Sequence, residues 1–313
     1  MEFLQPSTLD EALAAKAAHP DAVPIAGGTD VMVEINFDKH RPAALLDLNR
    51  VDELAQWEPE SGGGGGDDSH IRLGSCVSYA RVIDELAGRL PGLATAARTV
   101  GSPQIRNRGT VGGNLGAASP AGDSHPVLLA AGASVEAASV RGRRRIPIEE
   151  FFVKRNVGGT SMRAAVKRHA LAEDELITAI LVPPPAGPQQ FCKIGTRNAM
   201  VIAVSAFGLA LHPDRRSVGT GIGSAAPTPR RAREAEEFLA AALESGGLWE
   251  SRAALPDGLA AEFGQRVRAA ASPIDDVRGS AAYRLHSLAV MARRALTWAW
   301  IDYQQGSNRC VSD

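Results

Sequence analysis

Two runs of small residues constrain this chain more than any other feature of its sequence. One is the stretch 23–35, VPIAGGTDVMVEI, with the glycine pair Gly27 and Gly28, and the other is the stretch 109–123, GTVGGNLGAASPAGD. Glycine permits close backbone approach and positive φ, so a loop rich in it can aim several N–H groups at one point, where anions bind. Each run alone could be a set of tight turns. As a pair of G-G-(Thr/Asn)-x loops, however, they predict a site for a ligand with two phosphates.

The residues around the glycine pairs argue against two common nucleotide-binding motifs. The chain has no G-x-x-x-x-G-K-[ST] pattern, so a P-loop is not predicted. Val31, Val33 and Ile35 alternate with other side chains, and this period of two predicts a strand after the first glycine pair. A Rossmann turn would lead into a helix instead.

The composition is that of a globular chain without a general attraction to polyanions. Of its 313 residues 44% are hydrophobic, and the formal net charge is −1. The densest basic run, 141–145, is predicted to form the charged tip of a hairpin, so no nucleic-acid partner is expected. There is no run of about eighteen apolar residues and no leader-like pattern, so we expect no membrane partner and a cytoplasmic location.

The cysteines predict that any metal chemistry belongs to a partner. Cys76, Cys192 and Cys310 are widely separated and form no C-x-x-C pair. This spacing predicts neither a disulfide framework nor an iron–sulfur cluster nor a structural zinc site. Cys192 lies in an apolar run and is expected in the core.

Periodicity and capping signals predict a βαβ unit near the N-terminus and a separate C-terminal unit after Pro183. The pattern TLDE at 8–11 resembles a capping box that starts a helix ending before Pro20. Asp123 and His125 flank a second helix start, so capping and surface packing are the alternative roles for them. Strands are predicted at 2–4, 23–25, 31–35, 44–48, 71–77, 134–138, 145–148, 190–195, 201–211 and 218–224, and further helices at 82–90, 93–100, 127–131, 227–243 and 281–300.

Six motifs follow one another in an order that resembles one known family. They are AGGTD at 26–30, TVGGN at 110–114, SPAGD at 119–123, DELI at 174–177, KIGTR at 193–197 and DDVRGSAAYR at 275–284. Together they resemble the FAD-binding medium subunit of the molybdenum hydroxylases, the family of xanthine dehydrogenase and aerobic carbon monoxide dehydrogenase. The resemblance covers residues 1–300 approximately.

The resemblance implies an α+β fold in two domains and a tail. Residues 1–182 would form a FAD-binding domain of the vanillyl-alcohol-oxidase (PCMH) type, with subdomains at about 1–55 and 56–182. Residues 183–303 would form an α+β domain like the C-terminal domain of the CO dehydrogenase flavoprotein, and 304–313 a tail. The segment 275–284 is predicted to be structural or to contact a partner.

The resemblance also implies a non-covalently bound FAD whose pyrophosphate lies between the two glycine loops. Asp123 would bond the ribityl or ribose hydroxyls, and Ile177 would contact the adenine or isoalloxazine end. Lys193 would lie near the flavin ring, where a cation stabilises the anionic reduced flavin; the alternative is a solvent-facing strand lysine. Val100 stands where some relatives have a flavin-facing aromatic residue. The predicted cofactor-binding residues are Ile25, Ala26, Gly27, Gly28, Thr29, Asp30, Val31, Met32, Val100, Thr110, Val111, Gly112, Gly113, Asn114, Ser119, Asp123, Ile177 and Lys193, and no catalytic or metal-binding residue is predicted.

The implied partners are a large subunit with the molybdopterin cofactor and a small subunit with [2Fe–2S] clusters. The flavin would take electrons from the clusters and reduce NAD or another acceptor. A stand-alone flavin oxidoreductase of the same fold and a non-catalytic assembly subunit are the alternatives. Relative to the family, residues 154–167 look like an insertion at the flavin edge, which leaves the electron acceptor open.

Overall fold

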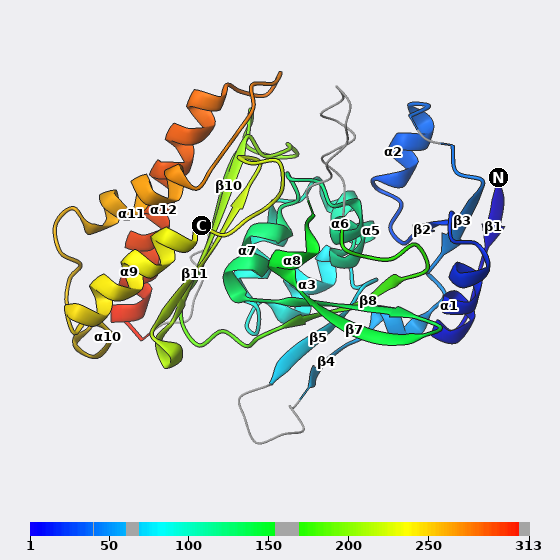
Figure 1. Ribbon diagram of the computed structural model, residues 1–313, viewed down its shortest axis with the longest axis horizontal. Coiled ribbons are helices and arrows are strands. Elements are labelled where there is room, and N and C mark those ends of the chain that lie inside the picture. The colour runs from blue at the N-terminus through cyan, green and yellow to red at the C-terminus, as the bar shows by residue number, and fades with distance from the viewer. Residues whose placement is uncertain (40, 61–68, 154–168, 307–313) are drawn as a thin grey trace.

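The computed structural model describes residues 1–39, 41–60, 69–153 and 169–306. Within these ranges the chain forms three sheets arranged along the long axis of the molecule, with helices between and outside them (Figure 1). This is the expected α+β architecture. None of the described helices is long and apolar enough to cross a membrane. The glycine-rich segment 61–68, the insertion 154–167 and Cys310 lie outside the described residues.

The N-terminal unit is the predicted βαβ unit. Its sheet is parallel in the order β1-β3-β2, and α1 joins β1 to β2. Thr8 caps α1, because its Oγ1 accepts the N–H of Glu11 at 3.2 Å, while the Glu11 carboxylate accepts the N–H of Ser7 at 2.8 Å. The elements are β1 (Glu2–Leu4), α1 (Leu9–Ala18), β2 (Val23–Ile25), α2 (Val31–Asn36), β3 (Ala44–Asp47) and the 3₁₀ helix η1 (Asp52–Ala55).

Two predictions around the glycine runs are wrong. Residues 31–35 form helix α2 and not a strand, since Gly28 turns the chain with φ of 73° and its carbonyl accepts the N–H of Met32. The second run is not an irregular loop, because Thr110 caps a short helix at Val111–Ala117. Alternation over six residues is a weak signal that the tertiary context overrides.

The middle sheet has the strand order β4-β5-β8-β6-β7, and all its neighbouring strands are antiparallel. The predicted hairpin is confirmed as β6–β7. Three arginines of the run 141–145 lie in β7, however, and not at the tip of the hairpin. One of them, Arg144, forms an ion pair with Glu175 at 2.7 Å. The strands are β4 (Trp57–Glu60), β5 (His70–Gly74), β6 (Ser134–Ser139), β7 (Gly142–Pro147) and β8 (Leu176–Val182). The helices are α3 (Tyr79–Leu86), α4 (Pro91–Arg98), α5 (Pro103–Arg108), α6 (Val111–Ala117), α7 (Ser124–Ala131) and α8 (Ile148–Phe151).

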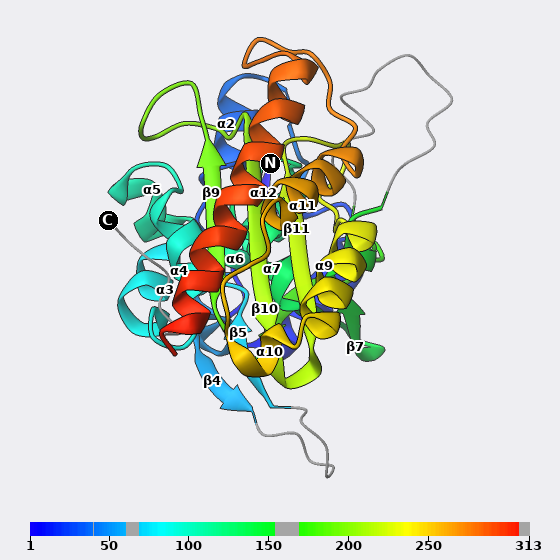
Figure 2. The same ribbon diagram turned by 90° about the vertical axis from the view of Figure 1, so that its left-hand side faces the viewer.

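The C-terminal sheet contains the three predicted strands, which are antiparallel in the order β11-β10-β9. Helices α9, α11 and α12 cover its outer face, around a core that includes Phe207, Phe263 and Leu288 (Figure 2). The elements are β9 (Gln189–Ile194), β10 (Ser205–His212), η2 (Pro213–Arg215), β11 (Ser217–Gly223), α9 (Arg233–Ser245), α10 (Leu248–Ser251), α11 (Leu259–Ala269) and α12 (Ala281–Gln304).

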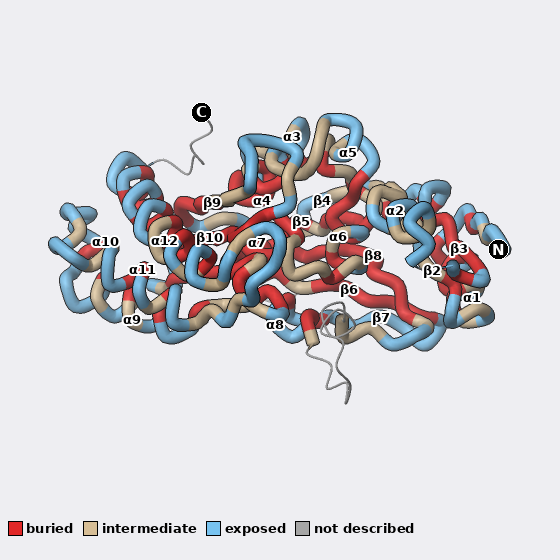
Figure 3. Tube along the Cα trace, turned by 90° about the horizontal axis from the view of Figure 1, so that it is seen from above, coloured by how far each residue is buried: buried red, intermediate tan, exposed pale blue. Residues whose placement is uncertain are grey.

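Helix α7 links the middle and C-terminal parts by lying on the inner face of β10 and β11. All eight of its residues are buried, whereas α2, near the N-terminal end of the molecule, buries none (Figure 3). A Cβ atom at Gly221 would lie 2.0 Å from the carbonyl oxygen of Pro126, and one at Gly208 would lie 2.6 Å from it. The absence of side chains at these strand positions therefore lets the helix backbone rest directly on the sheet.

Replacing Gly221 with alanine should lower the free energy of unfolding by about 1–3 kcal/mol, because the added methyl group overpacks the contact between β11 and α7. Urea unfolding measures this loss. The matched control is Gly88→Ala, where a new Cβ has no atom within 4 Å; it should change stability by less than about 1 kcal/mol. Equal losses in the two variants would contradict the close contact.

Candidate functional site

The two glycine runs lie side by side, as the sequence predicted. A Cβ atom on Gly27 would lie 1.8 Å from the carbonyl oxygen of Arg108, and one on Gly109 would lie 3.4 Å from Oγ1 of Thr29. Only glycine at position 27 can therefore pack against the backbone that leads into the second run. This contact holds the first run, between β2 and α2, against the segment between α5 and α6.

The first run presents free backbone donors. Among the described residues, no protein acceptor receives the N–H of Gly27, Gly28 or Thr29. These residues are neither fully buried nor fully exposed. Consecutive N–H groups around a residue with positive φ form a concave site for an anion.

The second run uses its backbone donors within the protein. The N–H of Gly112 bonds the carbonyl of Ser75 at 3.1 Å, and that of Gly113 bonds Oγ1 of Thr110 at 2.9 Å. The expectation that Gly112 and Gly113 present free N–H groups is therefore wrong, because capping of α6 and packing on Ser75 occupy them. The side-chain amide of Asn114 is the polar group of this run that extends beyond the helix backbone.

A buried ion pair joins the two predicted domains next to these runs. Lys193 of β9 donates from Nζ to Oδ2 of Asp123 at 2.6 Å and to the carbonyl of Thr99 at 3.0 Å. The side chains of Lys193 and Asp123 are 9% and 8% exposed. Lys193 is thus not a solvent-facing strand lysine. Asp123 stands at the start of α7, yet its side chain makes no capping hydrogen bond.

Asp123 keeps one acceptor free inside the protein. Its Oδ1 is buried and has no hydrogen-bond partner among the described residues, while Oδ2 also accepts from Oγ1 of Thr99 at 3.3 Å. Burial raises the pKa of this carboxyl, and the neighbouring Lys193 and Thr99 oppose the shift. An unpartnered carboxylate oxygen at this position fits a hydroxyl donor from a ligand.

The remaining predicted residues lie around this core of the site with different exposures. Ser119 belongs to the turn before Asp123, where its Oγ accepts the N–H of Ala121 at 3.3 Å. Ile177, in β8, is 8% exposed and reaches α6 at the position of Gly116. Val100 packs partly buried against the core of the middle sheet. Asp30 and Met32 are exposed, and Ile25, Ala26 and Val31 are of intermediate exposure.

Sequence reasoning missed three polar residues that support the site. Thr99 bonds both members of the ion pair. Tyr79, at the start of α3, and Ser124, at the start of α7, form a hydrogen-bonded chain that ends on Asn114. The available signal was position alone: Ser124 follows Asp123 directly, and Thr99 precedes Val100.

His125 is a core residue, so the expectation of surface packing is wrong. The side chain is fully buried, and its ring centroid lies 4.7 Å from that of Phe152. Burial lowers the pKa of His125 to about 3, against an opposing contribution from the Ser119 backbone. The imidazole is therefore neutral in the folded protein near pH 7.

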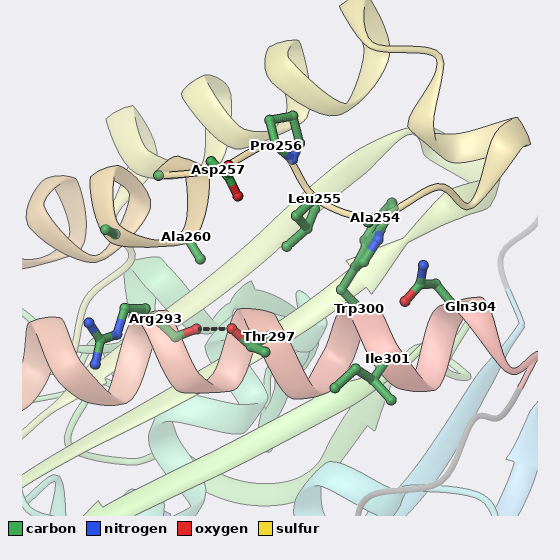
Figure 4. A pocket seen from close by; sticks show the side chains of 12 residues that line it. Ala254, Leu255, Pro256, Asp257, Ala260, Arg293, Thr297, Trp300, Ile301 and Gln304 are labelled. Atoms are coloured by element: carbon green, nitrogen blue, oxygen red, sulfur yellow. Dashed lines mark hydrogen bonds between the residues drawn. The ribbon is translucent and has the colours of Figure 1, made fainter.

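A groove of about 380 Å³ lies elsewhere, between α12 and the segment that enters α11 (Figure 4). Leu255, Trp300 and Ile301 contribute its apolar wall, and none of the predicted cofactor-binding residues lines it. The glycine runs and the buried ion pair thus lie outside this groove.

Comparisons with known proteins identify the family and the fold of this chain. The family model for the FAD binding domain in molybdopterin dehydrogenase matches residues 1–185, and the model for the CO dehydrogenase flavoprotein C-terminal domain matches residues 190–299. The nicotinate dehydrogenase FAD-subunit of Eubacterium barkeri is 32% identical over 77% of this chain and 80% of its own. The nicotine 6-hydroxylase medium subunit of Paenarthrobacter nicotinovorans is 30% identical over 96% of this chain and 97% of its own. Reconstituted CO dehydrogenase from Oligotropha carboxidovorans superimposes with a TM-score of 0.81 at 25% identity, over 96% of this chain and 98% of that chain.

The fold and the matched domains define a flavoprotein with a PCMH-like FAD-binding domain and a C-terminal CO dehydrogenase flavoprotein domain. The chain belongs to the family of FAD-binding subunits of molybdenum hydroxylase-type dehydrogenases, and it is a subunit of an oxidoreductase. This confirms the family that the six motifs indicated.

Lys193→Met should lower the free energy of unfolding by about 3–5 kcal/mol at pH 8, because it leaves the Asp123 carboxylate buried without its cation. The loss should shrink toward pH 5, since burial raises the pKa of Asp123 and the folded protein neutralises the carboxyl by taking up a proton. Chemical denaturation at both pH values measures the change. The double variant Lys193→Met, Asp123→Asn should recover most of the loss, and equal losses in the single and double variants would contradict the ion pair as its source.

Stability should also fall in acid because of His125. Its pKa is lowered from 6.5 to about 3 in the folded protein, so the unfolded chain takes up the proton first as the pH falls below 6.5. The contribution of this residue to the loss is about 2 kcal/mol at pH 5. His125→Leu should flatten the dependence of urea unfolding on pH between 7 and 5. His286→Leu, at an exposed position of α12, is the matched control, and equal slopes in the two variants would contradict the assignment.

Proposed function

We propose that the chain binds FAD non-covalently with the pyrophosphate between the two glycine runs. The observation that carries the proposal is the set of three free N–H groups at Gly27, Gly28 and Thr29, held against the second run by the contact of Gly27 with Arg108. A pyrophosphate supplies the anionic acceptors that such donors need. The proposed binding residues are those predicted from the sequence, with Gly112 and Gly113 serving through close packing.

The free oxygen of Asp123 supports the placement of the cofactor's hydroxyl groups. Its Oδ1 would accept from a ribityl or ribose hydroxyl and so gain the partner that the protein does not provide. The same negative charge would repel phosphates, so the pyrophosphate belongs at the donors of the first run instead. Lys193, fixed by Asp123 and Thr99, places one cation beside this carboxylate, at the edge of the proposed flavin site.

The proposed role of the chain is the exit stage of electron transfer. Bound FAD supplies the ability to take up electrons singly and release them in pairs. We propose that the electrons come from [2Fe–2S] clusters of a small subunit, after substrate oxidation at the molybdenum centre of a large subunit, and pass to NAD or another acceptor. The medium-subunit name of the nicotine 6-hydroxylase relative supports an assembly of this kind.

We also propose the domain division at residues 1–182 and 183–303, which falls in the connection between β8 and β9.

The purified chain should carry about one FAD, released on denaturation and identified by its spectrum and mass. In an FAD titration of the flavin-free protein, FAD should bind more tightly than FMN, because FMN lacks the pyrophosphate that the first run would hold. Co-purification with two further chains would distinguish the multi-subunit role from a stand-alone oxidoreductase. A colourless protein that takes up no FAD, even with candidate partner subunits present, would overturn the proposal and favour an assembly role.

A further inference from the structure

Three side chains from three helices form a continuous hydrogen-bonded chain beside the second glycine run. Tyr79 Oη lies 3.4 Å from Ser124 Oγ, and Ser124 Oγ lies 2.7 Å from Asn114 Oδ1. Tyr79 and Ser124 are 2% and 0% exposed. The tyrosine is fixed to the run by its backbone as well, because its N–H bonds the carbonyl of Gly109 at 3.0 Å.

The proton count gives this chain a direction. A phenol carries one proton, and Ser124 Oγ is the acceptor that the described residues offer to the buried hydroxyl of Tyr79. Ser124 then has one proton left, which it donates to Asn114 Oδ1. With the amide of Asn114 turned over, Nδ2 would donate to Ser124, Ser124 would donate to Tyr79, and the phenol proton would remain buried without an acceptor, which is unfavourable.

This direction decides which atoms of Asn114 face the site. The amide oxygen points to Ser124, so the NH₂ group, with two donors, is left for another acceptor. Among the described residues no protein group accepts from Nδ2 of Asn114. Because the N–H groups of Gly112 and Gly113 are used inside the protein, this NH₂ group is a donor that the second run can offer to an anion in their place.

We propose that Tyr79 and Ser124 are positioning residues that hold the Asn114 amide with its NH₂ group toward the pyrophosphate of FAD. The inference rests on the proposed FAD site and adds a means by which the second run recognises a phosphate although the N–H groups of its glycine pair are already used. Neither Tyr79 nor Ser124 contacts the cofactor. Their hydroxyl protons determine whether Asn114 presents donors or an acceptor to it.

The test is the affinity of the flavin-free full chain for FAD and for ADP, which carries the same pyrophosphate without the flavin. Asn114→Ala should weaken both affinities about 10- to 100-fold, the loss expected for hydrogen bonds to a charged group. Ser124→Ala should approach that loss, Tyr79→Phe should lose less, and Ser124→Thr, which keeps the hydroxyl, should restore binding. The double variant Ser124→Ala, Asn114→Ala should bind no worse than Asn114→Ala, because the serine acts through the asparagine.

Ser287→Ala is the matched control, since it also removes a buried serine hydroxyl, bonded at 2.7 Å to Ser205, but far along the chain in α12. It should leave both affinities unchanged. The positioning role is overturned, and the proposed function is not, if the wild-type protein binds FAD and Ser124→Ala binds it equally well. Additive losses in the double variant would have the same meaning. If Ser124→Ala does not fold, the Tyr79→Phe variant provides the test, and wild-type affinities of this variant for FAD and ADP would overturn the positioning role. Wild-type protein that binds neither FAD nor ADP would overturn the proposed function as well.

Discussion

The contact between Gly27 and the backbone of Arg108 is the constraint on which the site depends. It brings the end of β2, in the parallel sheet, against the segment that leads into α6, which packs on the middle sheet. The approach is so close that no Cβ atom fits between the two backbones. The free N–H groups of the first run are therefore held against the start of the second run, at a junction between the parallel sheet and the middle sheet.

The contact of α7 with β10 and β11 forms a second junction, between the middle and C-terminal sheets. The backbone of α7 rests on the side-chain-free stripe of β10 and β11, which places Asp123, just before α7, within reach of Lys193 in β9. The resulting ion pair is buried, and its desolvation is offset by hydrogen bonds to Thr99. The proposed site thus takes its donors for an anion, its acceptor for hydroxyl groups and its fixed cation from different parts of the chain.

Much of the fold could be predicted because its signals are local. The capping of α1 by Thr8, the βαβ unit, the hairpin β6–β7 and the three C-terminal strands all follow from neighbouring residues. The prediction of a strand at 31–35 was wrong because the turn at Gly28 leads into a helix. Alternating apolar residues form a strand only where a partner strand is available. The prediction that His125 packs at the surface was wrong for a similar reason, since its ring packs against Phe152, which is distant in the sequence.

The sequence by itself determined the family, the place of the two glycine runs and the residue types around them. These properties follow from side-chain size and local backbone freedom, which are the same in any context. The tertiary structure alone decided which donors stay free and which are used, because the partners are distant in sequence. Lys193 meets Asp123 across 70 residues, and Tyr79 meets Ser124 across 45. Hydrogen-bond partners and burial at such separations exist only once the three sheets have packed, so no local pattern contains them.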